Sequence, residues 1–380
     1  MQLAYKILDS VFAVEEGQWN RLLTQGDSPF QSWGYLAALE RSGCATQEHG
    51  WTPCHLAAYQ DETLVGVLPL FVKTHSYGEF IFDFAWADAA HRCGLNYYPK
   101  MVSMVPFTPV AGRGILVSGL VEDPECILLG LAKEALRMSQ DLNLSSLHLL
   151  YLSDAESDAL ESTRLLRRAT FQYQWVNEGY DDFSDYLGRF RSKRRAQIRR
   201  ERRELRQSGV VTRLISGADA SDSEIETMWT LYASTVDQFG FSQRYLNRAF
   251  FFDVCKQLGD TVQLLFAYEA NSPIGGTFNL VDNGVFYGRY WGALSQRPYL
   301  HFEVCYYRPI ELAIERGWHR VEAGAGGQHK MGRGFLPRVI HSAHVLHHPM
   351  LHQAVGQFLS QERVEILSAL EKASDWVFKT

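Results

Sequence analysis

The sequence lacks several features that would assign a protein to a class at once. It has no apolar run of eighteen residues, and its N-terminus does not show the basic and then apolar order of a signal peptide. The six cysteines are widely spaced without a CxxC pair, which argues against a disulfide framework or a zinc knuckle. Walker loops, dinucleotide fingerprints, nucleophile elbows and HExxH motifs are absent. We therefore expect a cytoplasmic protein with reduced thiols and no membrane span.

The composition is that of an ordinary globular protein. The chain has 380 residues, of which 46% are hydrophobic and 21% are charged. This length exceeds what one hydrophobic core usually serves, so two domains are expected. The predicted elements follow the same order in both halves: helices, an antiparallel meander, a helix and a strand. The sequence therefore predicts a mixed α/β protein with tandem domains, at residues 1–177 and 178–380.

The first half alternates predicted helices and strands. A Ser28-Pro29 pair is typical of a helix start, and two apolar runs around Asp61-Glu62 predict a hairpin. An irregular segment at residues 76–114 is rich in aromatic residues, and it is expected either to line a site or to cover a sheet edge. The predicted strands are 5–11, 54–59, 64–71, 146–152 and 170–176, and the predicted helices are 15–23, 28–43, 124–138 and 155–167.

The second half begins with a basic helix and continues into a meander. The Asp282-Asn283-Gly284 turn is a strong hairpin signal. Predicted helices span 186–207, 223–239, 243–258, 302–316 and 351–378. Predicted strands span 210–214, 262–269, 274–281, 285–291, 320–323 and 343–346.

The basic helix stands out in a chain whose net charge is −6. Ten Lys or Arg residues lie between Arg189 and Arg206, against two Glu residues, which gives this stretch a charge of +8. Such a run is either a solvated helix face or a positive stripe that grips phosphate groups. The candidate phosphate-binding residues include Lys193, Arg195 and Arg199. No RNA-binding motif with stacking aromatic residues accompanies them, so recognition of nucleic-acid bases is not predicted.

Several longer segments resemble one known family. They are SPFQSWGYL (Ser28–Leu36), HSYGEF (His75–Phe80), YYPK (Tyr97–Lys100), PFTPVAGR (Pro106–Arg113), SSLHLL (Ser145–Leu150), HFEVCYYRPIELAIERG (His301–Gly317) and GAGGQHKMGRGFLP (Gly324–Pro337). Together they resemble the FemAB-like family of GNAT-related proteins, often labelled peptidoglycan biosynthesis or recognition proteins. The basic stretch at 192–211 is more distantly similar to a segment of the Fem aminoacyltransferases.

The resemblance implies a fold of two GNAT-like domains, each a mixed and mostly antiparallel sheet flanked by helices. It also implies the transfer of an acyl or aminoacyl group onto an amine, with acyl-CoA or aminoacyl-tRNA as donor substrate and no tightly bound cofactor. The acceptor is expected to be a small molecule or to resemble a cell-wall precursor, and DNA is not an expected partner. The sequence departs from the GNAT pattern after 285–291, because GALSQRPYLHF replaces the usual glycine-rich acetyl-CoA signature.

Three short motifs supply candidate catalytic and binding residues. Gly324, Gly326 and Gly327 allow close approach of the backbone to a ligand, and their amides could form an anion-binding nest; a plain surface turn is the alternative. His301 and Glu303 open a helix, where one of them could serve as a general base or where Glu303 could simply be a first-turn charge. By resemblance, Lys330 contacts the ligand or stabilises an oxyanion.

The aromatic segment of the first half supplies further candidates. His75, Tyr98, Lys100 and Arg113 would give a substrate pocket with an apolar wall and two cations.

Five histidines near the C-terminus suggest a metal site but do not predict one. In the predicted strand, His344 and His347 point to opposite sides, and Pro349 interrupts any helix that would align the others. We therefore predict no metal site at His341, His344, His347, His348 and His352.

The sequence as a whole favours an acyltransferase of the FemAB-like type. The alternative is a non-catalytic protein that recognises a phosphorylated or cell-wall ligand on the same scaffold. Fold analogy by itself does not decide between them.

Overall fold

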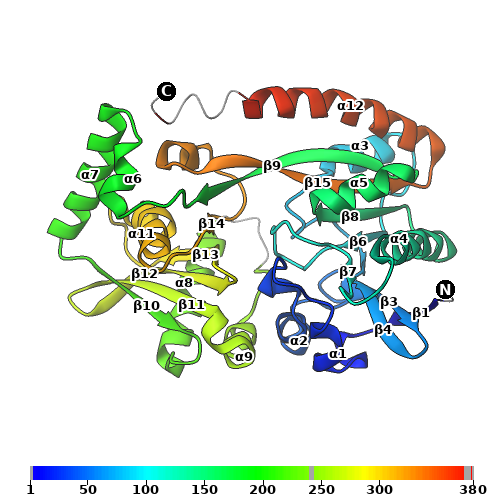
Figure 1. The fold of residues 1–380 in the computed structure, drawn as a ribbon, viewed down its shortest axis with the longest axis horizontal. Helices are drawn as coiled ribbons and strands as arrows, with labels where there is room; N and C mark the ends of the chain where they lie inside the picture. The colour runs from blue at the N-terminus through cyan, green and yellow to red at the C-terminus, as the bar shows by residue number, and fades with distance from the viewer. Residues whose placement is uncertain (1–2, 239–243, 372–377, 379–380) are drawn as a thin grey trace. The chain divides into compact units, whose positions relative to one another are not determined.

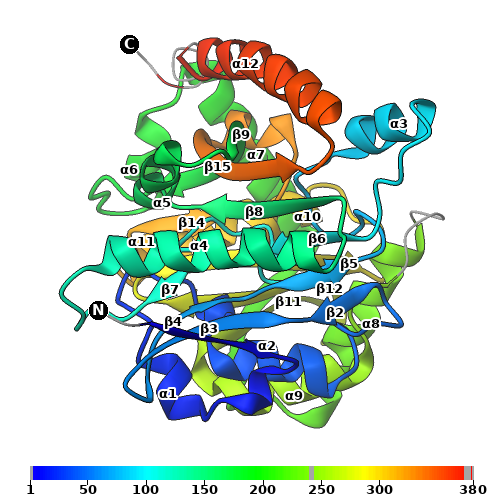
Figure 2. The ribbon, with the colours of Figure 1, turned by 90° about the vertical axis from the view of Figure 1, so that its right-hand side faces the viewer.

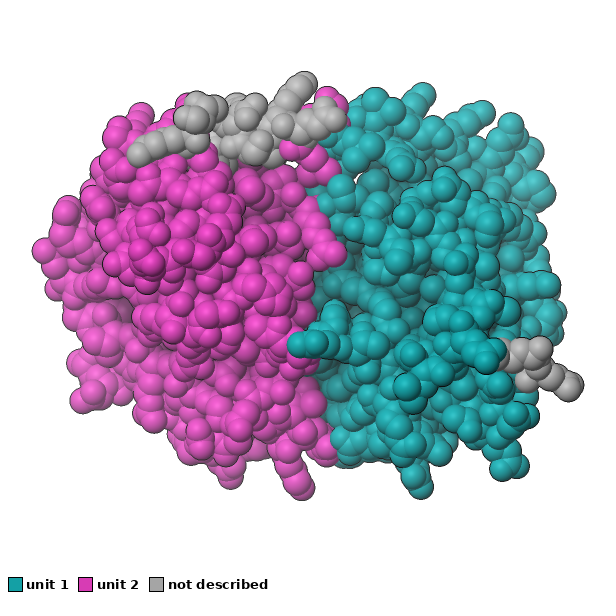
Figure 3. All heavy atoms as spheres, viewed as in Figure 1, with its two compact units in different colours: residues 1–171, 339–367 teal, residues 172–338, 368–380 magenta. Residues whose placement is uncertain are grey.

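The computed structural model describes residues 3–238, 244–371 and 378. The chain forms two compact units, which Figure 3 colours separately. Unit 1 contains residues 1–171 and 339–367, and unit 2 contains residues 172–338 and 368–380. The division differs from the predicted one because the chain passes from one unit to the other three times, in β9 (Leu166–Val176), in β15 (Leu336–Leu346) and near the end of α12 (Pro349–Glu371). Residues 339–367 therefore complete the first unit, although the sequence assigns them to the second domain.

Unit 1 contains two groups of paired strands (Figure 1). A four-stranded antiparallel sheet has the order β1-β3-β4-β7, and a second group has the order β15-β8-β6-β5-β2. Within the second group, β6 and β8 run parallel, and the pairs β15·β8, β6·β5 and β5·β2 are antiparallel. The strands are β1 (Ala4–Leu8), β2 (Trp51–Pro53), β3 (His55–Gln60), β4 (Thr63–Leu68), β5 (Phe71–Lys73), β6 (Lys100–Ser103), β7 (Leu116–Val117) and β8 (Ser146–Leu152).

The helices of unit 1 cover these strands. The helix α4 packs against strands of both groups, as Figure 2 shows, and its buried Ile127, Leu131 and Ala135 join the largest core of the unit. The helices are α1 (Glu16–Asn20), α2 (Trp33–Arg41), α3 (Phe84–Arg92), α4 (Pro124–Asp141), α5 (Asp154–Ala159) and, for most of its length, α12 (Pro349–Glu371). Val355 and Leu359 of α12 pack with Trp86 of α3, which explains why the last helix belongs to this unit.

Several predicted elements of unit 1 differ from the observed ones. The predicted helix at 155–167 is α5 followed by a 3₁₀ turn at Leu160–Ser162, and β9 already begins at Leu166. The predicted helix at 28–43 is a short 3₁₀ turn at Pro29–Gln31 followed by α2, and the capping side chain is that of Ser32, which accepts a hydrogen bond from the amide of Tyr35. The irregular aromatic segment contains both α3 and β6.

Unit 2 is built on an antiparallel meander. The strand order is β10-β11-β12-β13-β14-β9, in which β13 and β14 run parallel and the other neighbouring strands run antiparallel. The strands are β10 (Val211–Ser216), β11 (Val262–Glu269), β12 (Ser272–Asp282), β13 (Val285–Ala293) and β14 (Arg320–Glu322). In each unit a helix thus connects two parallel strands, namely β6 to β8 and β13 to β14, which gives the two units the same element order.

The helices of unit 2 depart from the prediction in two places. The basic helix is divided at 189–191 into α6 (Phe183–Gly188) and α7 (Ser192–Gln207). The other long helices are α8 (Asp222–Gln238) and α9 (Arg248–Leu258). The predicted helix end at 239, the predicted start at 243 and residues 372–377 of the predicted final helix lie outside the described residues.

The helix that connects β13 to β14 contains an irregular turn. It begins as α10 (Leu300–Phe302), passes through a π-helical turn at Glu303–Tyr307 and continues as α11 (Arg308–Glu315). A π turn inserts an extra residue and occurs often at functional sites. Here it determines which side chains of the helix face the loop after β14.

The contact between α8 and β13 provides a test of the fold of unit 2. A Cβ atom added at Gly292 would lie 1.7 Å from the backbone oxygen of Leu231. We predict that Gly292→Ala lowers the free energy of unfolding by at least about 3 kcal/mol, the upper end of ordinary overpacking costs. Denaturant unfolding measures this change. Gly188→Ala is the control, because no atom lies within 4 Å of its added Cβ, and an equal effect of both substitutions would contradict the packing.

Candidate functional site

Unit 2 contains a cavity of about 260 Å³ that includes most of the predicted catalytic residues. It is bounded by the end of β13, the π turn and the loop that follows β14. We call it the Lys330 cavity. Its lining includes the predicted residues His301, Gly324, Gly326, Gly327 and Lys330. The structure therefore brings together residues that lie up to 29 positions apart in the sequence.

Lys330 lies in the wall of this cavity with only 3% of its surface exposed. Its Nζ donates hydrogen bonds to the carbonyl oxygens of Gly324 at 2.8 Å and of Ala325 at 3.1 Å. Burial lowers the pKa of Lys330 to about 8, and Arg289 lowers it further while Cys305 opposes the shift. The side chain is therefore a cation at neutral pH, but one that loses its proton more readily than an exposed lysine.

The glycine loop adopts the left-handed conformation that its sequence allows. The φ angles are 71° at Gly324, 68° at Gly326 and 88° at Gly327, a region that residues with a Cβ rarely occupy. The carbonyls of Gly324 and Ala325 point to Lys330 and fix its ammonium group. The loop was predicted to bind an anion through its amides. In the structure its carbonyls hold the ammonium group of Lys330.

His301 contributes an uncharged imidazole to the same cavity. Burial lowers its pKa to about 4, and the nearby His329, Arg333 and Lys330 lower it in addition. Its ring lies 4.6 Å from the ring of Trp291 and 5.3 Å from that of Tyr306, measured between centroids. His301 is therefore neutral at pH 7 and has the protonation state that a general base requires.

Two cavity residues were not among the predicted site residues. Tyr306 and His329 form a hydrogen bond of 2.9 Å between Oη and Nε2, and both line the cavity. His329 adjoins Lys330 in the sequence, and Tyr306 is buried in the π turn. An α-helical periodicity does not describe this turn, so no sequence pattern indicates that Tyr306 faces His329.

Glu303 does not line the cavity. Its carboxylate accepts hydrogen bonds from Arg202, at 3.0 Å from Nε and 2.7 Å from Nη2. Arg202 also donates to Glu311, at 3.0 and 2.8 Å. The residue predicted as a possible base is thus an ion-pair partner of α7, and the described residues that line the Lys330 cavity include no Asp or Glu.

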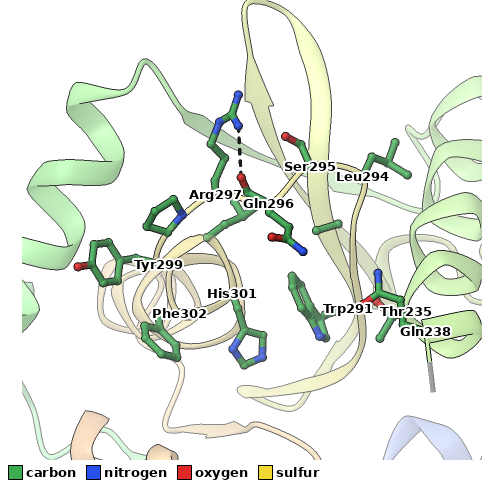
Figure 4. A pocket seen from close by; sticks show the side chains of 13 residues that line it. Thr235, Gln238, Trp291, Leu294, Ser295, Gln296, Arg297, Tyr299, His301 and Phe302 are labelled. Atoms are coloured by element: carbon green, nitrogen blue, oxygen red, sulfur yellow. Dashed lines mark hydrogen bonds between the residues drawn. The ribbon is translucent and has the colours of Figure 1, made fainter.

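A larger cavity of about 710 Å³ adjoins the Lys330 cavity. The two share Trp291 and His301, and the loop between β13 and α10 forms much of the larger one (Figure 4). Arg297 lies in this loop, where it pairs with Glu269 at 2.6 Å and donates to the carbonyl of Gln296. This is the segment in which the sequence lacks a glycine-rich signature, and the structure opens a wide hollow there.

The candidate substrate residues of unit 1 form a buried ionic network. Lys100 is fully buried, and its Nζ donates to Ser76 at 2.8 Å, to Glu79 at 2.9 Å and to Asp83 at 2.5 Å. Burial alone would lower the pKa of Lys100, but its two carboxylate partners outweigh burial and raise it. Tyr98 joins the network through a 2.8 Å hydrogen bond to Ser76.

A second lysine lies beside this network. The ammonium of Lys73 lies 3.4 Å from the centroid of the Trp51 ring and donates to the carbonyl of Tyr77. Burial lowers its pKa to about 7. The sequence reasoning missed Lys73, Glu79 and Asp83, because charged residues in separate elements carry no spacing signal.

The remaining candidates of the first half are held by neighbouring backbone and side chains. Arg113 donates through Nε to Asp27 at 2.8 Å and through its other nitrogens to the carbonyls of Leu22 and Val117. His75 donates a 3.0 Å hydrogen bond from Nε2 to the carbonyl oxygen of His49. None of the four candidates of unit 1 lines one of the cavities described for unit 2.

The predicted phosphate-binding residues lie on α7, away from the lining of the Lys330 cavity. Lys193 and Arg199 are exposed and Arg195 is half-buried. Only Arg199 of these three borders a hollow, which is a different one between α6 and α7.

The C-terminal histidines have separate partners. His341 lies 3.2 Å from Asp154, His347 bonds Ser139, and the buried His344 contacts His148 at 2.8 Å between Nδ1 atoms. Within residues 3–238, 244–371 and 378, no group of three metal-ligating side chains could hold an ion. The same part of the chain has no helix long and apolar enough to cross a membrane.

The lowered pKa of Lys330 has a measurable consequence for stability. Between pH 8 and 10.5 the unfolded chain binds a proton at this residue that the folded chain does not, so stability rises with pH in that window. We predict that the free energy of unfolding of the wild type, relative to that of Lys330→Met, rises by about 2 kcal/mol between pH 7.5 and 10. Parallel denaturant titrations measure the difference, and a difference that stays constant with pH would contradict the burial of this lysine.

Lys100 provides a second test. Its removal leaves Glu79 and Asp83 buried without their cation, so we predict that Lys100→Met lowers the free energy of unfolding by about 3 to 5 kcal/mol. Lys133→Met, at an exposed position of α4, is the control and should change stability little. If Lys100→Met were as stable as the control, the ionic network would not be a structural element.

Solved structures of several other proteins resemble this chain over most of its length. The solved structure of FemX has a TM-score of 0.53 and 10% identity, and covers 90% of this chain and 98% of FemX. A conserved protein of unknown function from Bacteroides thetaiotaomicron has a TM-score of 0.51 and 11% identity. The match covers 90% of this chain and 99% of that protein. The C-terminal domain of a putative lysylphosphatidylglycerol synthetase from Agrobacterium fabrum has a TM-score of 0.50 and 9% identity. The match covers 91% of this chain and 95% of that domain. These likenesses show a shared fold.

The expected mixed α/β fold is confirmed, since each unit has a mixed and mostly antiparallel arrangement of strands with flanking helices. No curated protein matches the chain. Residues 10–379 match the model of the FemAB-like family, which is described as peptidoglycan biosynthesis/recognition. The chain therefore belongs to the FemAB-like family.

Proposed function

We propose that the protein is an acyl- or aminoacyl-transferase. In the Lys330 cavity it would move the acyl group of a donor substrate onto an amine of the acceptor. The observation that carries this proposal is the pairing of a buried cation, Lys330, with a neutral base, His301, around one cavity. Membership of the FemAB-like family supports it. The acceptor is a small molecule or resembles a cell-wall precursor.

The two side chains meet the separate needs of the reaction. The acceptor nitrogen must be uncharged when it attacks the carbonyl carbon, and His301 accepts the proton that the nitrogen loses. Negative charge then develops on the carbonyl oxygen, where the ammonium of Lys330 stabilises it. The new C–N bond replaces the C–O bond of an ester or the C–S bond of a thioester, and the leaving oxygen or sulfur takes up the proton.

Tyr306 and His329 are positioning residues in this mechanism. Their hydrogen bond joins the π turn to the loop that carries Lys330. The Tyr306 ring also lies edge-on to His301. Both side chains therefore limit the movement of the base and the cation relative to each other.

The donor is acyl-CoA or aminoacyl-tRNA, and no tightly bound cofactor is needed. The larger cavity supports a bulky donor, because it reaches the Lys330 cavity at His301 and Trp291. Its loop lacks the usual glycine-rich acetyl-CoA signature, which favours a donor held differently from acetyl-CoA in ordinary acetyltransferases.

One observation favours a second candidate function. The described lining of the Lys330 cavity has no carboxylate, and Glu303 is engaged by Arg202. A site with fewer acid–base groups suits a non-catalytic protein that recognises a phosphorylated or cell-wall ligand. Binding of such a ligand without any acylated product would distinguish this candidate from the transferase.

The test combines ligand screening with product analysis. Thermal shifts against acyl-CoA, charged tRNA and nucleotide-linked wall precursors identify a donor and an acceptor, and mass spectrometry detects the acylated product. We predict that Lys330→Met reduces transfer by a factor of 10² or more, the range for loss of one oxyanion-stabilising group. The matched control is Lys256→Met, at an exposed position of α9. Unchanged turnover in a folded Lys330→Met protein would remove Lys330 from the reaction.

A further inference from the structure

Unit 2 has a third hollow, which shares no residue with the two cavities described above. It has a volume of about 390 Å³ and lies between α6 and α7. We call it the arginine groove. Four arginines and no carboxylate are among its lining residues, which are Phe183, Leu187, Arg199, Arg202, Arg203, Arg206 and Gln207. A hollow lined by four arginines supports the interpretation of the basic stretch as a phosphate-binding surface.

The orientation of α7 is fixed from its opposite side. Ile198 and Leu205 are buried in hydrophobic cores, and Glu201 and Arg202 are buried as well. These positions recur at three to four residues and hold one face of the helix against the unit. Arg199, Arg203 and Arg206 are exposed beside them.

The arginines of the groove differ in the partners they already have. Arg202 donates to both Glu303 and Glu311. It lines the groove, but the two carboxylates already neutralise its charge. Arg206 lies 3.7 Å from Glu311, and Arg199 makes a 3.4 Å contact with Ser184. Among the described residues, Arg203 has no acidic side chain within ion-pair distance. Three arginines thus retain donors for an added anion.

Their spacing indicates the kind of anion. Guanidinium groups bind phosphate oxygens through paired hydrogen bonds. From Arg199 to Arg206 the helix rises by about 10 Å, since each residue adds about 1.5 Å. A single phosphate group does not extend over this distance, whereas linked phosphate groups come within reach of two or three of the side chains.

The aromatic residue of the groove argues against single-stranded RNA. The ring of Phe183 lies 4.3 Å from the guanidinium carbon of Arg202, and it makes edge contacts with Tyr186 and Tyr307. Proteins that bind single strands use free aromatic faces on which bases stack. Phe183 already has a cation on its face, so the groove offers charge without a stacking surface.

We propose that the arginine groove binds a small molecule that carries linked phosphate groups, such as a pyrophosphate ester. This site is distinct from the Lys330 cavity and does not depend on the transferase proposal. Its ligand is recognised by charge and by the spacing of Arg199, Arg203 and Arg206 along α7.

Calorimetric titration of the full chain with inorganic pyrophosphate at low ionic strength tests the proposal. We expect pyrophosphate to bind more tightly than orthophosphate, and Arg203→Gln and Arg206→Gln each to weaken binding about tenfold through loss of a charge-assisted hydrogen bond. Arg200→Gln is the matched control, because Arg200 is exposed on the same helix but does not line the groove. Lys330→Met should bind pyrophosphate as the wild type does.

Three results would overturn the proposal. The first is no binding of pyrophosphate, and the second is an equal loss in Arg200→Gln, which would indicate general charge attraction. The third is binding of a short RNA oligonucleotide without binding of pyrophosphate. Thermal unfolding of each variant checks that the fold is retained, which is expected because these positions are exposed.

Discussion

The arrangement of unit 2 depends on one buried ionic contact, in which Arg202 bridges Glu303 and Glu311. Arg202 and Glu303 are each 7% exposed at the side chain, and five hydrogen bonds of 2.7 to 3.2 Å join the arginine to the two carboxylates. Such a contact gains little over an apolar pair, but loss of one partner leaves a buried charge uncompensated. It therefore fixes α7 to the helix that contains the π turn.

The neighbouring residue on α7 extends this connection to the loop after β14. Glu201 accepts a hydrogen bond from the Tyr307 hydroxyl and lies 3.4 Å from Arg333. Tyr307 belongs to the π turn, and Arg333 follows Lys330 in the same 3₁₀ segment. Two adjacent residues of one basic helix thus hold both structural parts of the Lys330 cavity. The charge that is conspicuous in the sequence has an internal role as well as an exposed one.

How much of this was accessible from the sequence depends on the range of the interaction. The order of strands and helices follows from local periodicity and turn residues, and the glycines at 324, 326 and 327 mark a left-handed loop beside Lys330. The pairing of Glu303 with Arg202 joins positions 101 residues apart, and no local pattern encodes it. The π turn also escapes sequence reasoning, because a helical wheel assumes 3.6 residues per turn.

The two crossings of the chain in β9 and β15 affect how the protein is made. Unit 1 needs Val345 and Leu346 of β15 and the apolar face of α12, which follow the whole of residues 172–338 in the chain. The usual order of synthesis, in which an N-terminal domain folds while the rest is still being translated, is therefore not open to this unit as a whole. Its nascent strands must wait until β15 and α12 have been synthesised, and a fragment that ends at residue 177 would lack a strand and a helix of the first unit.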